Sequence, residues 1–287
     1  MQPQGPFDPL RDMTKFFRVR GAARLAACPI CGSVKIGRLW QLPQTRLTHE
    51  AHLASPGAAN DGLYINYLPM LNVPQDIYCY DACGDCEALF RNPKDDDQAI
   101  YARDESKVAS FRTSGVKEFE GSAVFYRKRF PPGTKRVVDA ACGAGQVLAI
   151  LKRDMPLLEL AGLELSRPAV DFMNRELGIR AHAADLDMDD LSAHIPDGWA
   201  DFIIFQEAFE HVRAPVLVTQ KLMRMLRKGG RLHFTAQRYG ADNELQIRVE
   251  EPIFINETTL DYVVRETGAK LAEVGKDIKL RVMFEKV

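Results

Sequence analysis

The chain of 287 residues lacks the features that mark several classes of protein. No apolar run approaches the about 20 residues of a membrane-spanning helix. Neither sign of charge dominates, since 38 Lys and Arg stand against 39 Asp and Glu, so no global positive field indicates a nucleic-acid binder. Glycine and proline number only 20 and 16, which excludes collagen-like and low-complexity chains. The composition is that of a globular protein with a sizeable core.

A secretory apolar stretch is also missing, so we expect a cytoplasmic protein in a reducing compartment. The basic segment 11–27 has Asp8 and Asp12 beside or within it, which argues against a presequence and favours a solvated amphipathic helix. In a reducing compartment, paired cysteines indicate a metal site more often than a disulfide.

Five of the six cysteines lie in the N-terminal third of the chain. Cys28 and Cys31 form one C-x-x-C pair, and Cys83 and Cys86 form another. Each tight turn points two sulfurs at one spot, so the spacing predicts one structural zinc on these four cysteines. Cys79 could replace Cys83 or Cys86 as a ligand. The plainer alternative is a set of reduced thiols buried as small apolar side chains.

Short apolar strands alternate with helices from Lys135 onward. This alternation predicts an α/β fold: a Rossmann-like, seven-stranded, mostly parallel sheet with helices on both faces, preceded by a small zinc-ribbon-like module. We expect strands at 136–140, 158–163, 179–184, 201–205, 231–236, 270–274 and 280–284, and helices at 146–153, 168–177, 215–226 and 256–267. The predicted division is a zinc-binding module at 1–93, a helical linker or lid at 94–132 and the main domain at 133–287.

Polar and glycine residues follow the first two of these strands. Such sheets bind ligands at the carboxyl ends of their strands. Gly143 and Gly145 leave backbone open to a ligand where a helix begins, although Leu148 stands where a dinucleotide fingerprint would need a third glycine. Glu164 ends the second strand 19 residues after Gly145, a spacing at which a carboxylate accepts hydrogen bonds from ribose hydroxyls.

These stretches resemble the ordered motifs of class I S-adenosylmethionine-dependent methyltransferases; the matching positions are 139–145, Glu164, Asp185, 201–212 and 226–231. The segment 207–212, with Pro215, resembles the branch that includes ubiquinone-biosynthesis O-methyltransferases. The cysteine-containing front end is similar to the zinc-binding leaders of some bacterial members. Glu87 departs from that pattern, because the leaders commonly have glycine after the last cysteine.

The resemblance implies a site for S-adenosylmethionine. Glu164 would accept from the ribose, Asp185 from the adenine amine, and Asp139 would reach the amino group of the methionine portion. The complete set of implied cofactor-binding residues is Asp139, Ala141, Gly143, Gly145, Glu164, Leu165, Asp185, Leu186 and Gln206. Cys142 lies in the loop that contains Gly143 and Gly145, called the glycine loop below. We expect its thiol to be a packed side chain and not a nucleophile.

The methyl acceptor is less well defined by the sequence. We expect a small molecule or a sugar, methylated on oxygen, with His211 as the catalytic base and Arg238 and Tyr239 as candidate substrate contacts. An RNA methyltransferase whose zinc module holds RNA is the alternative, supported by the basic patch at 11–24 together with Arg127, Lys128 and Arg129. A non-catalytic partner protein that retains the fold is a third hypothesis, against which the complete cofactor motif set argues.

Overall fold

The computed structural model describes residues 25–41, 79–92, 101–239, 252–276 and 279–287. The chain divides into two compact units. The first unit takes Met1–Asp96 and Gln237–Tyr262, and the second takes Asp97–Ala236 and Val263–Val287. The basic patch at 11–24 and most of the segment that separates the two cysteine pairs lie outside the described residues.

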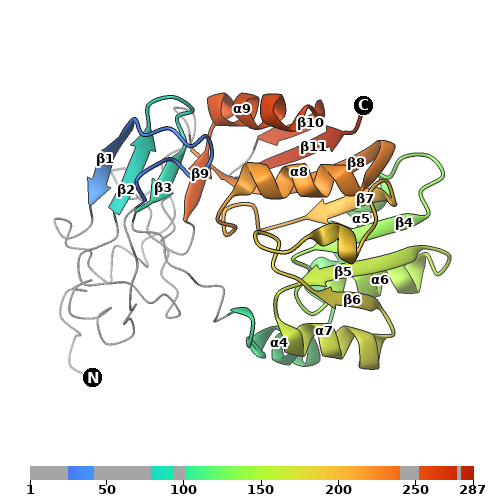
Figure 1. Ribbon diagram of the computed structural model, residues 1–287. Helices are drawn as coiled ribbons and strands as arrows, with labels where there is room; N and C mark the ends of the chain where they lie inside the picture. The colour runs from blue at the N-terminus through green and yellow to red at the C-terminus, as the bar shows by residue number, and fades with distance from the viewer. Residues whose placement is uncertain (1–24, 42–78, 93–100, 240–251, 277–278) are drawn as a thin grey trace, which may run out of the picture. The chain divides into compact units, whose positions relative to one another are not determined.

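A seven-stranded sheet forms the centre of the second unit (Figure 1). Its strands, in spatial order, are β6 (Arg180–Ala183), β5 (Glu159–Glu164), β4 (Arg136–Ala140), β7 (Ala200–Phe205), β8 (Leu226–Arg238), β11 (Lys279–Glu285) and β10 (Lys270–Lys276). The four pairings from β6 to β8 are parallel, and β10 pairs with β11 antiparallel. The mostly parallel, seven-stranded sheet predicted from the sequence is therefore confirmed among the described residues.

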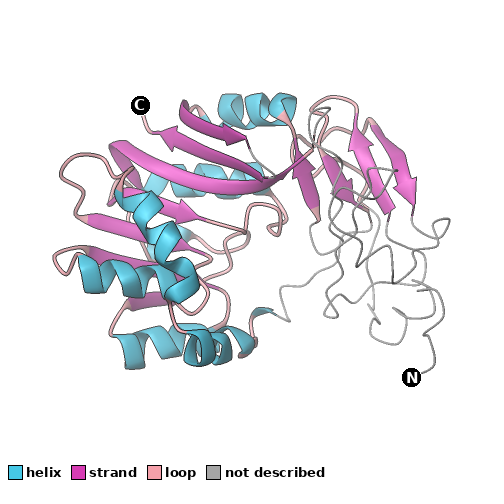
Figure 2. Ribbon diagram, turned by 180° about the vertical axis from the view of Figure 1, so that it is seen from behind, coloured by secondary structure: helices cyan, strands magenta, loops and turns pink. Residues whose placement is uncertain are grey.

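Helices cover both faces of this sheet. Figure 1 shows α8 in front of the strands, and Figure 2, seen from behind, shows helices over the opposite face. The helices of this unit are α4 (Ser106–Ser114), α5 (Glu120–Arg127), α6 (Gln146–Asp154), α7 (Arg167–Phe172) and α8 (Pro215–Met225), with short helical turns at Lys117–Phe119, Met173–Leu177 and Leu191–Ala193. Helix α9 (Glu257–Thr267) and strand β8 each cross the boundary between the units.

The helix ends follow the sequence signals. The Ser166 side chain accepts from the Ala169 amide at 3.3 Å and so caps α7, while Gly178 ends the π-helical turn after α7 in the left-handed conformation. Pro215 occupies the first turn of α8, where its missing N–H has no intrahelical partner to lose.

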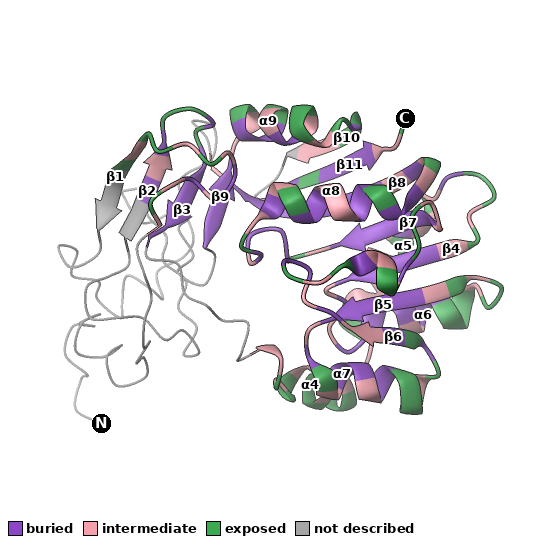
Figure 3. Cartoon of the chain, in the orientation of Figure 1, coloured by how far each residue is buried: buried purple, intermediate pink, exposed green. Residues whose placement is uncertain are grey.

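The core of the second unit lies where α5 and α6 pack on the central strands. All six residues of β7 are buried, as expected for a strand covered on both faces (Figure 3). Phe202 and Ile204 of β7 form one cluster with Tyr126 of α5 and Leu151 of α6. Burial of such side chains stabilises the strand order, and this order brings the carboxyl ends of β4, β5 and β7 to one edge.

The first unit contains a small antiparallel sheet. Its strands are β1 (Ile36–Gln41), β2 (Cys79–Cys83), β3 (Leu89–Arg91) and β9 (Ile253–Ile255), paired in that order. β9 also pairs in parallel with Gln237 and Arg238, the last two residues of β8. The segment Gln237–Tyr262 thus groups with the N-terminal residues, whereas the sequence-based division placed it in the domain at 133–287. The helical lid at 94–132 stays a prediction.

Candidate cofactor site and metal centre

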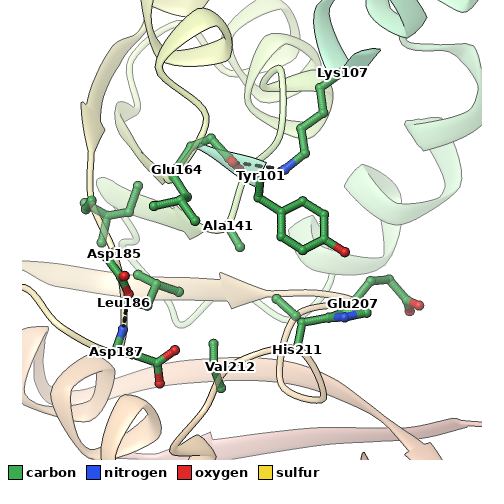
Figure 4. A pocket seen from close by; sticks show the side chains of 14 residues that line it. Tyr101, Lys107, Ala141, Glu164, Asp185, Leu186, Asp187, Glu207, His211 and Val212 are labelled. Atoms are coloured by element: carbon green, nitrogen blue, oxygen red, sulfur yellow. Dashed lines mark hydrogen bonds and ion pairs between the residues drawn. The ribbon is translucent and has the colours of Figure 1, made fainter. Parts of the chain in front are cut away.

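Two cavities open at the carboxyl ends of the central strands of the second unit. The first has a volume of about 240 Å³ and the second of about 380 Å³. They share three lining residues, Lys107, Ala141 and Glu207. The first cavity is lined by Glu164, Leu165, Asp185, Leu186 and His211 among others (Figure 4). Asp139, Gly143 and Gln206 line the second.

The two glycines of the loop after β4 have different reasons to be glycine. Gly143 has a φ of +59° and lines the second cavity, and a Cβ there would meet no atom closer than 3.8 Å. Gly145 has a φ of +80°, and a Cβ there would lie 2.7 Å from Sδ of Met173. Gly143 therefore leaves room on the ligand side, while Gly145 allows the start of α6 to pack against Met173.

Cys142 is a packed side chain, as the sequence analysis expected. Its sulfur occupies the space above Gly162, where a Cβ would lie only 2.7 Å away, and it lies 3.7 Å from Sδ of Met173. Burial, with the charge of Asp139 next, raises the pKa of this thiol well above its usual value. A thiol that does not ionise is a poor nucleophile.

Glu164, at the end of β5, is 2% exposed and receives three hydrogen bonds. The Gly143 amide donates to Oε2 at 2.7 Å, and the Ser166 amide donates to Oε1 at 2.9 Å. The ammonium of Lys107, from α4, pairs with Oε1 at 2.9 Å (Figure 4). These donors compensate the burial of the carboxylate and fix its direction toward the first cavity.

Asp139, at the end of β4, is buried without such donors. No hydrogen bond joins its carboxylate to another group in the described part of the chain, and the residue is 5% exposed. Burial, and then the negative charge of Glu164, raise the pKa of Asp139 well above its usual value. Because it lines the second cavity, a positively charged ligand group beside it would favour the ionised form.

The acidic run after β6 divides between ligand-facing and structural positions. Oδ1 of Asp185 accepts from the amides of Asp187 and Met188 at 2.9 and 3.2 Å, which stabilises the turn. Asp187 accepts from the amides of Arg213 and Ala214 and so holds the start of α8. Oδ2 of Asp185 takes no hydrogen bond from another described residue, so one oxygen of this cavity-lining carboxylate is available to a donor.

The end of β7 holds two polar side chains. The Tyr126 hydroxyl donates to Oε1 of Gln206. Glu207 has a φ of +52° and is held by Thr235, which accepts from its amide at 2.8 Å, and by an ion pair with Lys279. Ala141 has a φ of +61°, so two residues that line both cavities have left-handed backbone that non-glycine residues rarely adopt. Such conformations cluster at functional sites.

His211 lines the first cavity and is not among the residues of the second. Its ring lies edge-on to that of Tyr101, with 6.4 Å between the ring centroids. Figure 4 shows the imidazole below the Tyr101 ring and beside Glu207, across the cavity from Glu164. The predicted base therefore shares a cavity with Glu164 and Asp185, while Gln206 and Asp139 line the neighbouring one.

The four predicted metal ligands converge in the first unit. The sulfurs of Cys28, Cys31, Cys83 and Cys86 all lie within 4.8 Å of one another. The Cys28 and Cys86 sulfurs are 3.6 Å apart, and those of Cys31 and Cys83 are 3.5 Å apart. Tetrahedral zinc with Zn–S bonds of about 2.3 Å needs sulfurs roughly 3.8 Å apart, so the cluster fits this ion.

Backbone groups support the cluster. The amides of Asp85 and Cys86 donate to the Cys83 sulfur at 3.4 and 3.5 Å, and such hydrogen bonds orient a metal ligand. The amides of Gly32 and Glu87 donate to the carbonyls of Cys28 and Cys83 and close the two turns. Cys79 lies on β2, where it pairs in register with Gln41.

Glu87, which replaces the glycine of the leader pattern, has the left-handed backbone that a glycine would adopt, with a φ of +62°. The Tyr239 hydroxyl donates to its carbonyl, and Asn256 donates to its carboxylate at 2.7 Å. Tyr239, expected as a candidate substrate contact, is thus bonded to the cysteine turn. The side chain of Arg238, its companion, is 5% exposed and pairs with Glu257 at 3.4 Å.

Comparison with known proteins gives one family match and several structures of similar fold. The family model described as a methyltransferase domain matches residues 138–234. The match covers β4 to most of β8, the strands whose ends carry Asp139, Glu164 and Gln206. No curated protein matches the chain.

Solved structures share this fold. An O-methyltransferase family protein from Burkholderia thailandensis is 17% identical, with a TM-score of 0.52 over 66% of this chain and 62% of that one. A SAM-dependent methyltransferase from Leishmania major is 18% identical, with a TM-score of 0.51 over 66% and 82%. The [4+2]-cyclase SpnF is 21% identical, with a TM-score of 0.44, and this chain covers 58% of its length. The likeness to the first two structures, whose TM-scores exceed 0.5, shows the fold alone, which is Rossmann-like.

The candidate site includes residues that the sequence analysis did not name. Tyr101 and Lys107 line the first cavity from the segment that precedes the domain, and neither belongs to a recognisable motif. The helical segment expected at 94–132 includes Lys107, but nothing in the sequence indicated that this residue reaches Glu164. No described helix is long and apolar enough to cross a bilayer.

Proposed function

We propose that this protein transfers a methyl group from S-adenosylmethionine to an oxygen of a small molecule or a sugar. The observation that carries the proposal is the convergence of the glycine loop with Asp139, Glu164 and Asp185 on two adjoining cavities of a methyltransferase domain. The segment 207–212 supports a place near the ubiquinone-biosynthesis O-methyltransferases.

The charges of the cavities suit this cofactor. S-adenosylmethionine carries a sulfonium, an ammonium and a carboxylate, and supplies a methyl group for direct displacement when bound. Four carboxylates line the first cavity and two line the second, with Glu207 common to both, which favours a ligand with more positive than negative groups. Gly145, also expected to bind the cofactor, lines neither cavity and would act through the packing of α6.

Each residue would have a separate task. Glu164 would accept from the ribose, and Asp185 from the adenine amine, with Leu165 and Leu186 beside the ring. Asp139 would hold the ammonium, and Gln206 would line the floor near the sulfonium. His211, which lines the first cavity, would take the proton of the acceptor hydroxyl.

The cysteine cluster would hold one structural zinc. A closed set of four thiolates leaves no open position for catalysis, so the ion would stabilise the turns of the first unit. The reducing cytoplasm that we expect for this protein is compatible with thiolate ligation.

A transfer assay with labelled S-adenosylmethionine on fractionated lysate, with and without ribonuclease, tests the acceptor class. The proposal predicts that label enters low-molecular-weight compounds and that ribonuclease leaves this unchanged. Label confined to ribonuclease-sensitive material would support the RNA alternative. Absence of both transfer and cofactor binding would contradict the proposal.

A further inference from the structure

Lys107 is the only lysine or arginine among the described residues that line either cavity. The other charged groups there are carboxylates: Asp139, Glu164, Asp185, Asp187 and Glu207. Lys107 lines both cavities, and its Cδ lies 3.9 Å from the position that a Cβ on Gly143 would occupy. Its side chain thus passes from α4 over the glycine loop, between the two cavities.

The hydrogen bonds on Glu164 leave little room for a further ligand. A carboxylate oxygen has about two acceptor positions. Oε1 uses both, on the Lys107 ammonium and the Ser166 amide, and Oε2 uses one on the Gly143 amide. A ribose diol needs two positions, so one of the three present donors must leave when the diol binds.

Lys107 is the donor that can leave. The other two donors are backbone amides, fixed by the loop after β4 and by the start of α7. Helix α4 itself is anchored on α7, since Phe111 packs on Phe172 with ring centroids 5.0 Å apart and Arg112 pairs with Glu176 at 2.6 Å. The exchange therefore requires rotation of one lysine side chain, whose stem has four flexible carbons.

We propose that Lys107 selects for a cofactor that carries a carboxylate. Its ammonium leaves Glu164 as the ribose hydroxyls bind and pairs with the cofactor's carboxylate at the second cavity. Glu164 then has the ribose hydroxyls as donors, and the ammonium has the cofactor's carboxylate as its partner. A nucleoside without this carboxylate displaces the same ammonium but provides no anionic group with which the ammonium can pair. This inference rests on the proposed function, because it assumes that the ribose binds at Glu164.

Calorimetry with two probes tests this role. S-adenosylhomocysteine has the ribose and the carboxylate, and 5′-methylthioadenosine has the ribose alone. For Lys107→Met we expect S-adenosylhomocysteine to bind roughly tenfold more weakly, while 5′-methylthioadenosine binds as well as before or better. Lys107→Arg should retain the wild-type preference, and Lys117→Met, at an exposed lysine that lines neither cavity, is the matched control.

Equal weakening of both probes in Lys107→Met, or no change in either, would overturn the inference. A second measurement needs no variant: the methyl ester of S-adenosylhomocysteine should lose most of its advantage over 5′-methylthioadenosine in the wild type. An ester that binds like the free acid would also overturn it. If the wild type binds none of the three compounds, the proposed function fails, and that outcome is distinct from an altered preference.

Discussion

The Gly143 amide donates to Oε2 of Glu164 at 2.7 Å, which joins the loop after β4 to the end of β5. Parallel pairing of the two strands, with Asp139 opposite Gly162, sets this distance. The carboxylate that we assign to the ribose is therefore also a support of the glycine loop. A change at Glu164 should affect both ligand affinity and loop order.

We predict that Glu164→Ala weakens S-adenosylmethionine binding by roughly 2–3 kcal/mol, because two charge-assisted hydrogen bonds to the ribose are lost. Calorimetry on folded protein measures this. Glu159→Ala, at the exposed start of the same strand, is the control and should bind normally. Unchanged affinity in folded Glu164→Ala would place the ribose elsewhere.

We predict that cofactor binding releases a proton from Asp139. Burial and the charge of Glu164 raise the pKa of Asp139 in the free protein, and a bound ammonium would lower it again. Binding should therefore tighten as the pH rises and should show a heat that depends on the ionisation enthalpy of the buffer. Asp139→Asn should abolish the buffer dependence, and a wild type without any such dependence would contradict the assignment.

The same shift has a consequence for stability without ligand. A carboxyl whose pKa is raised on folding binds more protons in the folded state, so its contribution to stability falls as pH rises from the usual value through the raised one. Asp139→Asn should then unfold at a higher temperature than the wild type at neutral pH, with the difference vanishing in acid. Thermal melts at several pH values measure this, and a variant less stable than the wild type throughout would refute it.

We predict about one zinc per chain, held by Cys28, Cys31, Cys83 and Cys86. Metal analysis should show that Cys83→Ser loses the ion and that Cys79→Ser keeps it. The reverse result would mean that the site exists with a different ligand set. Purified protein without metal, and with all six thiols titrating freely before denaturation, would be incompatible with the site.

Replacement of His211 by Gln separates a catalytic from a packing role. As the base for a hydroxyl acceptor, its loss should lower turnover by roughly 10²–10⁴-fold and leave cofactor affinity nearly intact. Turnover and melting temperature are measured together. A destabilised variant with turnover within a few-fold of the wild type would assign the proton to another group, and Glu207, which lines both cavities, would be the next to test.

The sequence predicted the positions of Asp139, Gly143 and Glu164. Each of these residues ends a strand or follows one directly, and the carboxyl ends of parallel strands meet at one edge of the sheet. Lys107 was not predicted, because it reaches Glu164 from a separate helix across 57 residues of sequence, and no local pattern records that contact.

The first unit shows a similar limit. The cysteine spacing predicted the cluster, but β3 and β9, with three residues each, are too short for their periodicity to be recognised. Their pairing joins residues far apart in the chain, such as Leu89 with Phe254. The segment Gln237–Tyr262 belongs to the same unit as the cysteine turns. The hydrogen bond from the Tyr239 hydroxyl to the Glu87 carbonyl is another such long-range contact.

A crystal structure with S-adenosylhomocysteine bound is the most direct test of the central claim that the two cavities form one cofactor site. The account predicts the ribose on Glu164, the adenine beside Asp185 and Leu186, and the amino-acid end in the second cavity with its ammonium on Asp139. Ordered ligand at any other place on the protein, or a ribose that makes no bond to Glu164, would contradict it.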